Sequence, residues 1–332
     1  MFKVKKKVLR ELFSVAAFLI SLAYLYRSIN FNELSIAAAF LISLAYLYRS
    51  INFNELSIAL KEANYEYLFL AILLSFLTLF FAATRWYLVL RRVQKTSFKR
   101  TIQAFVSGYY LMAILPPTVG HIVKVKLVGG DYFAALSSLA FGMTMEIVII
   151  LSFGFIFLGF TKLGLIGIAL ILLAFLYDKV FHKTALAFFR FWENLGAKKI
   201  SEKLRDWWSR GYAGWSIARK NKSGFLLVFS ISLVVIFIQI LGLMLVGKAF
   251  SLEISFKQAL YAFLMSVIFA SLSGIPSGIG ANEFGILVGI GSSTKAALTA
   301  FLYKFIFQYM YSIAGAFVFY RLLGGHHEDS TG

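Results

Sequence analysis

A carboxylate, an amide and several helix-breaking residues interrupt an apolar stretch late in the chain. This segment, GIPSGIGANE at residues 274–283, holds one proline and three glycines before its Asn and Glu. In hydrocarbon, non-helical backbone lies only where protein or a water-filled cavity surrounds it, and an ionisable side chain there typically faces a pathway or a partner. Close helix packing at the glycines is the structural alternative. The sequence predicts a substrate or ion site, with candidate residues Pro276, Gly278, Gly280, Asn282 and Glu283.

A similar break lies earlier, in LPPTVGHIVKVK at residues 115–126. PPTVG and PSGIG share a proline, two free positions, a β-branched apolar residue and a glycine, and all three prolines of the chain lie in these two breaks. Half-helix N-termini at such breaks offer unpaired N–H groups to anions. The candidate headgroup-binding residues of this break are Pro116, Gly120, His121 and Lys124.

Ionisable residues within apolar segments extend the candidate site. Lys304 lies in the middle of an apolar run, too deep to reach the headgroups easily, so we expect it to be paired or functional. Glu146 and Glu283 could pair with such lysines or carry protons. Other roles stay open: Glu283 could cap the half-helix that it begins. Lys124 could extend to the cytoplasmic headgroups, and His121 could simply pack, carry a proton or bind phosphate.

The composition identifies the elements that must position these residues. Of 332 residues, 60% are hydrophobic and 14% are charged, against roughly 45–50% and 25% in soluble domains. We therefore predict an all-α, polytopic helical membrane protein of the cell membrane. The formal charge of +18 gathers between apolar runs, where Lys and Arg set topology and meet anionic lipid, so no nucleic acid partner is expected. The absence of cysteine excludes disulfides and thiolate metal sites.

Basic loops orient the apolar segments, because loops rich in Lys and Arg stay in the cytoplasm. The span at 67–83 is expected to end at a cytoplasmic loop that contains Arg85, Arg91, Arg92, Lys95, Lys99 and Arg100. Further spans are predicted at 133–160, 163–177, 225–246 and 296–320, with a turn at Thr161 and Lys162. Both termini are expected in the cytoplasm. Labelling of introduced cysteines is expected to find positions 130 and 200 cytoplasmic and position 252 external.

Two segments remain, and each must enter and leave the membrane on one side. Residues 101–128 are predicted to form a re-entrant hairpin from the cytoplasm, and residues 258–291 one from outside. The predicted fold has about six full spans plus two opposed re-entrant broken-helix hairpins, related as an inverted repeat. Its parts are an N-terminal span at 1–60, a first half at 61–177 with its break at 115–121, a basic amphipathic loop at 178–224, a second half at 225–323 with its break at 274–283, and a polar tail at 324–332.

The N-terminal part contains an exact duplication, in which residues 16–37 recur without one change as residues 38–59. True structural repeats diverge, so a recent tandem duplication or an error in the assembled gene sequence explains the identity. Each copy offers about 15 apolar residues where a span needs about 20. We expect one copy to cross the membrane and the other to lie at the interface or extend the helix.

The stretch 178–224 mixes Phe and Trp with Lys and Arg at helical spacing, as interfacial amphipathic helices do. It is expected to lie on the cytoplasmic leaflet, and docking of a partner enzyme is the alternative. The chain shows no Gly-rich phosphate loop, zinc-ligand spacing or nucleophile elbow. We therefore expect no enzymatic activity, no cofactor and no metal, and oligomerisation stays open.

The order of the motifs resembles a known family, the flippase-like membrane domain of lysylphosphatidylglycerol synthases, which also occurs as stand-alone archaeal and bacterial proteins. The resemblance covers roughly residues 60–323 and is carried by TRWYLVLRRV, LPPTVGHIVKVKLV, Glu146, GIPSGIGANEFG and Lys304. Its most specific part is the PxGxGxxE element that ends at Glu283. At the first break the family usually has an acid and, three residues later, an arginine, where this chain has His121 and Lys124.

The resemblance implies movement of a lipid or lipid-linked headgroup across the bilayer. Anionic or phosphate-bearing membrane lipids, such as phospholipids or polyprenyl-phosphate sugars, are the implied partners. No segment resembles the soluble aminoacyl-transfer domain of the synthases, so we do not expect this chain alone to transfer amino acids. The predicted function is a translocator of lipids or lipid-linked precursors. The alternative is a non-transporting membrane subunit that anchors or regulates a lipid-modifying or glycosylation enzyme.

Overall fold

The computed structural model describes residues 58–328, apart from positions 116, 158 and 274 and short gaps between 195 and 221. This part is all-α, as predicted. Three of its helices are long and apolar enough to cross a membrane: Tyr65–Val93, Tyr132–Phe157 and Gly224–Ala249. The chain is therefore an integral membrane protein with several apolar helices. The duplicated segment lies outside the described residues, except for positions 58 and 59.

Helix α4 (Tyr65–Val93) is longer than predicted and contains Arg85. It begins where the Asn64 side chain accepts the Glu66 N–H, at 3.0 Å. The expectation that Arg85 belongs to a basic loop is wrong, because Trp86, Val89 and Leu90 recur at helical spacing and are buried. Their burial continues the helix past Arg85, and the turn to the next helix begins only at Gln94.

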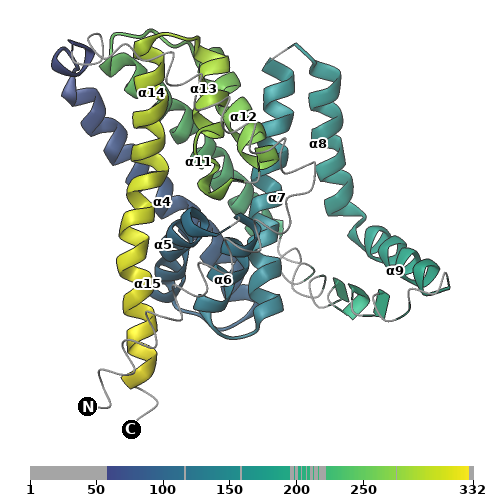
Figure 1. Ribbon diagram of the computed structural model, residues 1–332. Helices are drawn as coiled ribbons and strands as arrows, with labels where there is room; N and C mark the ends of the chain where they lie inside the picture. The colour runs from purple at the N-terminus through teal and green to yellow at the C-terminus, as the bar shows by residue number, and fades with distance from the viewer. Residues whose placement is uncertain are drawn as a thin grey trace.

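The two predicted breaks separate two pairs of helices. The first pair is α5 (Phe98–Ile114) and α6 (Pro117–Val128); the second is α12 (Phe256–Ser273) and α13 (Ala281–Ile290), joined through the 3₁₀ turn η1 (Pro276–Gly278). Figure 1 shows α12 and α13 in the upper half of the bundle and α5 and α6 in the lower half. Members of each pair pack closely at glycines: a Cβ on Gly120 would lie 3.0 Å from Met112 Cα, and one on Gly285 would lie 2.5 Å from Ser266 N.

Helices α7 (Tyr132–Phe157) and α8 (Thr161–Leu176) pack as a hairpin, and α9 (Asp178–Asn194) follows. The predicted turn at Thr161 and Lys162 is wrong, because both residues belong to α8 and the chain turns just before them, at Gly159, whose φ is +90°. With 16 residues, α8 is about 24 Å long. Figure 1 shows α9 leaving the bundle at the lower end of α8.

The last helical stretch carries an irregular turn in its middle. Helix α14 (Thr294–Lys304) continues through the π-helical turn η2 (Phe305–Tyr309) into α15 (Met310–Glu328), which extends into the predicted polar tail. The N–H of Met310 donates to the carbonyl of Phe305, five residues back, as the wider turn requires. The predicted span at 296–320 is therefore one helical path with an inserted residue.

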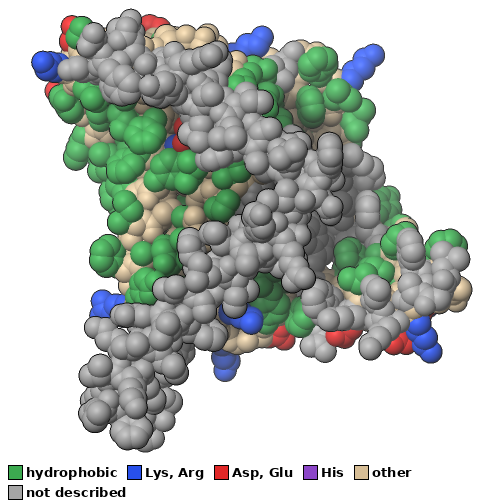
Figure 2. Space-filling view, in the orientation of Figure 1, with side chains coloured by type: hydrophobic (Ala, Val, Ile, Leu, Met, Phe, Trp, Pro, Cys, Tyr) green, Lys and Arg blue, Asp and Glu red, His purple; other side chains and the backbone are tan. Residues whose placement is uncertain are grey.

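Apolar side chains fill the inside of the bundle and also cover its outside. The main core lies between α11 (Lys222–Ala249), α12, α13 and α14 and includes Leu243, Leu264 and Ile286. Outward-facing aromatic residues such as Phe69, Phe237 and Phe317 are more than half exposed, and Figure 2 shows hydrophobic side chains spread over the bundle's surface. Such a surface suits contact with lipid chains.

Candidate functional site

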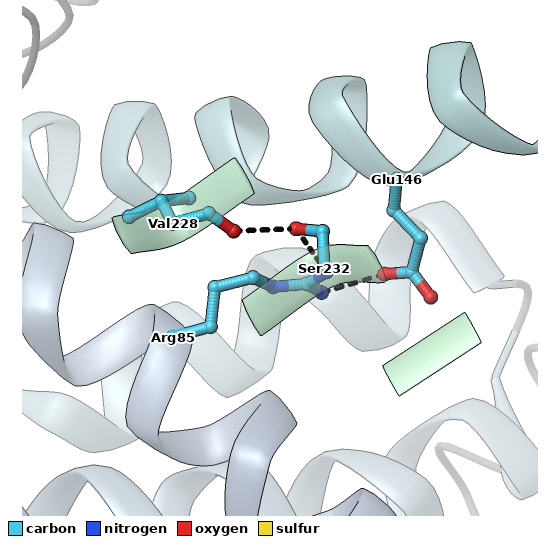
Figure 3. A network of polar contacts seen from close by, with 4 residues as sticks. All are labelled: Arg85, Glu146, Val228 and Ser232. Carbon is cyan, nitrogen blue, oxygen red and sulfur yellow. Dashed lines mark hydrogen bonds and ion pairs between the residues drawn. The ribbon is translucent and has the colours of Figure 1, made fainter. Parts of the chain in front are cut away.

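An ion pair lies buried in the middle of the bundle, between α4 and α7. The Arg85 Nη2 atom is 2.5 Å from Glu146 Oε2, and the two side chains are 7% and 24% exposed. Figure 3 shows how Nη1 of the same guanidinium donates to the Ser232 hydroxyl at 3.1 Å, while that hydroxyl donates to the Val228 carbonyl at 2.9 Å. The arginine is therefore held by α7 and α11 together. Its carboxylate partner is the less enclosed of the two.

Lys124 of α6 lies close to this ion pair, in the wall of the same cavity. Only 3% of the residue is exposed, and its ammonium lies 4.8 Å from the ring centre of Phe105 and 5.5 Å from that of Trp86. Gly108 makes room for it, since a Cβ there would lie 2.3 Å from the lysine Cδ. Aromatic faces attract cations but do not neutralise them. Lys124 is thus a buried basic side chain without an ion pair among the described residues.

Lys304 is the last residue of α14 and lines a cavity with the same ion pair. It is 8% exposed and also has no ion pair in the described part of the chain. The π turn that follows places Gln308 and Tyr309 on the same side as Lys304, because a wider turn aligns residues four and five apart. Gln308 donates to the Ser277 carbonyl at 2.7 Å, and Tyr309 donates to Glu283. The turn therefore connects Lys304 with the second break.

Two adjacent cavities, of about 180 and 220 Å³, bring these residues together. They share the walls Ala82, Arg85, Phe105, Tyr109, Met112 and Glu146. The first continues to His121 and Lys124, and the second to Gln239, Lys304 and Gln308. Their charged walls are three cations, Arg85, Lys124 and Lys304, and one carboxylate, Glu146.

Two buried polar atoms without a hydrogen bond in the described part of the chain belong to residues in the walls of these cavities. The Nδ1 atom of His121 and the hydroxyl of Tyr303 are buried without a hydrogen-bond partner among the described residues, and both residues line the cavities. Buried polar atoms in proteins nearly always have partners, so such atoms call for water or a ligand. The arrangement can accept an anion that carries several hydrogen-bond acceptors, such as a phosphate.

Glu283 lies in the second break and is not among the cavity walls. Its Oε2 accepts the Gly280 N–H at 2.8 Å, so the carboxylate caps the N-terminus of α13. Gly280 adopts φ +83° and Gly278 φ +62°, which L side chains rarely do. Asn282 supports the same loop by donating to the Ser277 carbonyl at 2.7 Å and accepting from the Ser266 hydroxyl at 2.9 Å.

The predicted site residues thus fall into two groups. His121, Lys124, Glu146 and Lys304 line the cavities. Gly278, Gly280, Asn282 and Glu283, with Pro276 at the start of η1, build the neighbouring break, and Gly120 brings α6 close to α5. Pro116 lies outside the described residues.

Glu146 pairs with an arginine rather than with either buried lysine. That arginine, Arg85, is absent from the predicted site, because charge counting assigned it to a loop. The signal that could have found it is its place on the buried face of an amphipathic pattern, three residues after Ala82 and four before Val89. Within the described residues, no group of three or more His, Asp or Glu side chains could hold a metal ion.

Comparison with known proteins agrees with the resemblance seen in the motifs. Residues 15–315 match the family described as the lysylphosphatidylglycerol synthase TM region. A comparison with curated proteins gave no match. The family match spans nearly the whole chain, including both breaks, the Arg85–Glu146 pair and Lys304. This chain therefore belongs to the lysylphosphatidylglycerol synthase transmembrane-region family.

Proposed function

We propose that this protein moves a phosphate-bearing lipid, either a phospholipid or a polyprenyl-phosphate sugar, across the membrane. The observation that carries the proposal is the pair of buried lysines, Lys124 and Lys304, that line adjacent cavities without an ion pair in the described part of the chain. A cavity with surplus positive charge inside an apolar bundle suits a headgroup that must leave water to cross the bilayer.

A phosphate would supply the negative charge that the lysines lack. Removing a charged group from water costs several kcal/mol in a protein interior. Hydrogen bonds that involve a charged group contribute about 1.5–3 kcal/mol each, so an anionic ligand would offset much of that cost. The ammonium of lysine offers three donors that can turn toward phosphate oxygens. The Arg85–Glu146 pair keeps the shared wall of the two cavities polar without adding net charge.

Translocation also needs access from both leaflets. We propose that α5–α6 and α12–η1–α13 are the two members of an inverted repeat within a fold of about six full spans, with both termini in the cytoplasm. Their positions in opposite halves of the bundle support this relation (Figure 1). The turn η1 of the second pair contacts α5 of the first, so the two pairs meet directly.

Reconstitution of the full chain into liposomes tests the proposal. The liposomes would contain fluorescent phosphatidylglycerol in one series and a labelled polyprenyl-phosphate sugar in another, and a membrane-impermeant reductant would bleach the outer leaflet. We expect bleaching to extend to inner-leaflet label only when the protein is present. The proposal fails if neither lipid moves faster than in protein-free liposomes.

A second candidate function is anchoring or regulation of a lipid-modifying or glycosylation enzyme, without transport. The name of the family supports it, since that name belongs to the membrane region of a lipid-modifying synthase. The exposed aromatic residues of α9 offer a surface for such a partner. This alternative predicts no lipid movement in liposomes and stable co-purification of an enzyme of lipid modification with the chain.

A further inference from the structure

Helix α9 follows the apolar helix α8 and extends away from the bundle (Figure 1). The preceding apolar helix α8 ends at Leu176, and the Val180 N–H donates to the Tyr177 carbonyl at 2.9 Å within the turn between them. Because only one residue separates the two helices, α9 begins close to the end of α8. A helix that follows an apolar segment of the membrane directly, and turns away from it, lies near the membrane–water boundary.

One face of α9 is packed against the segment that follows it. The ring of His182 stacks on Tyr212 with centroids 3.8 Å apart, and Trp208 donates its indole N–H to His182 Nδ1 at 3.0 Å. The ring of Phe189 lies edge-on to Trp208 at 6.4 Å. These contacts fix the rotation of α9 about its own axis and determine which side chains point outward.

The opposite face is apolar and open. Val180, Phe188 and Phe191 are 55%, 55% and 58% exposed. They lie eight and three residues apart, which places them on one side of an α-helix. Three large apolar side chains exposed together on one helix mark an interaction surface with a partner or a membrane. At the position of α9, Figure 2 shows hydrophobic side chains above and both basic and acidic ones along the lower edge.

A basic edge borders this apolar face. Lys179, Lys183 and Arg190 are exposed and fall on one flank of the helix. A surface groove of about 500 Å³ runs along this flank and is lined by Lys183, Leu186, Ala187, Arg190, Phe191 and Asn194. Glu193 does not face this flank, since it lies on the packed side, 3.0 Å from Arg205.

We propose that α9 binds anionic phospholipids of the bilayer surface. Lys183 and Arg190 contact the phosphate groups, while Phe188 and Phe191 enter the boundary between headgroups and acyl chains. Charge complementarity selects this occupant: a basic flank beside an aromatic face at the membrane boundary matches a negatively charged lipid surface. The groove that Lys183 and Arg190 line has room for a lipid headgroup. This site is separate from the cavities and does not depend on lipid translocation.

Single fluorescent probes on the full chain in nanodiscs test this proposal. Because the chain has no cysteine, Phe188→Cys and Phe191→Cys can each carry one environment-sensitive label. We expect both labels to be quenched by lipids with a spin label near the headgroup, and more strongly with phosphatidylglycerol than with phosphatidylcholine alone.

Removing the basic charges tests the role of the anionic lipid. Each Lys or Arg near an anionic surface contributes about 1 kcal/mol, so K183Q/R190Q should lower the equilibrium constant for binding of α9 to the bilayer surface about 30-fold. The matched control K183R/R190K should retain it.

A label at Glu253→Cys, exposed in the turn after α11, gives the signal of an aqueous position. Labels on α9 that iodide quenches as strongly as this one, in both kinds of bilayer, would overturn the proposal and assign the face to a protein partner. Equal loss in K183R/R190K and K183Q/R190Q would also overturn it. Each variant is first purified by size-exclusion chromatography, and only protein that elutes at the volume of the unchanged chain is measured. Unfolded protein is thereby excluded.

Discussion

Removing both members of the Arg85–Glu146 pair should lower the free energy of unfolding by less than the sum of the two single removals. An arginine stays charged in proteins, so Glu146→Gln leaves a buried cation with the Ser232 hydroxyl as its remaining contact in Figure 3. Breaking buried pairs in this way costs about 3–5 kcal/mol. We expect about 3 kcal/mol, at the low end, because the Glu146 side chain is 24% exposed.

The reverse change, Arg85→Gln, should cost less. It leaves Glu146, whose side chain is 24% exposed and can be hydrated, so we expect about 2 kcal/mol. The double variant removes both charges and should also lose only about 3 kcal/mol, which gives a coupling energy of about 2 kcal/mol between the two sites. Two residues that do not touch would instead add their separate costs.

Equilibrium unfolding in mixed micelles, followed by circular dichroism, measures these free energies. Lys126→Gln is the control, because Lys126 is exposed on the same membrane half and its loss should change the free energy of unfolding by less than about 0.5 kcal/mol. Additivity of the two single variants within about 0.5 kcal/mol would show that the ion pair does not stabilise the folded protein, and would refute this reasoning.

Two further predictions concern the second break and the helix α13 that follows it, and one concerns topology. Glu283→Gln weakens the cap on the Gly280 N–H and should cost about 1–2 kcal/mol in the unfolding assay; an unchanged value would contradict the cap. Gly285→Val forces a side chain against the backbone of α12 and should cost about 2 kcal/mol or more, whereas Val288→Ala, on the exposed side of α13, should cost less than about 1 kcal/mol. Impermeant thiol reagents added to intact cells should label Glu253→Cys but not Lys95→Cys, and the opposite pattern would invert the proposed topology.

Local signals are enough to predict the breaks and the apolar helices, but not the end of α4 or the start of α8. Proline removes a backbone donor, and glycine tolerates positive φ, so GIPSGIGANE had to interrupt a helix wherever it lay. The capping role of Glu283, held open from the sequence, follows from its place three residues after Gly280. The buried position of Lys304 agrees with its central place in an apolar run.

Features that depend on tertiary contacts could not be predicted in this way. The sequence predicts a loop at Arg85, because basic residues near a span usually mark its end, and nothing local reveals Glu146 of another helix as its partner. The π turn at 305–309 is associated with two distant contacts, Gln308 with Ser277 and Tyr309 with Glu283. A sequence pattern reports the period of a helix, and one inserted residue shifts that period too little to be seen.

Lipid translocation by point variants of the two buried lysines tests the proposed function most directly. Lys124→Gln and Lys304→Gln keep a polar side chain, one atom shorter, but remove the positive charge at the cavities. Lys126→Gln removes an exposed charge two residues from Lys124. One hydrogen bond to a charged group contributes about 1.5–3 kcal/mol, so each buried-lysine variant should move labelled phosphate lipid about 10–100 times more slowly. Lys126→Gln should move it at the rate of the unchanged protein. Equal rates for all three variants and the unchanged protein would contradict the claim that these cations carry the headgroup.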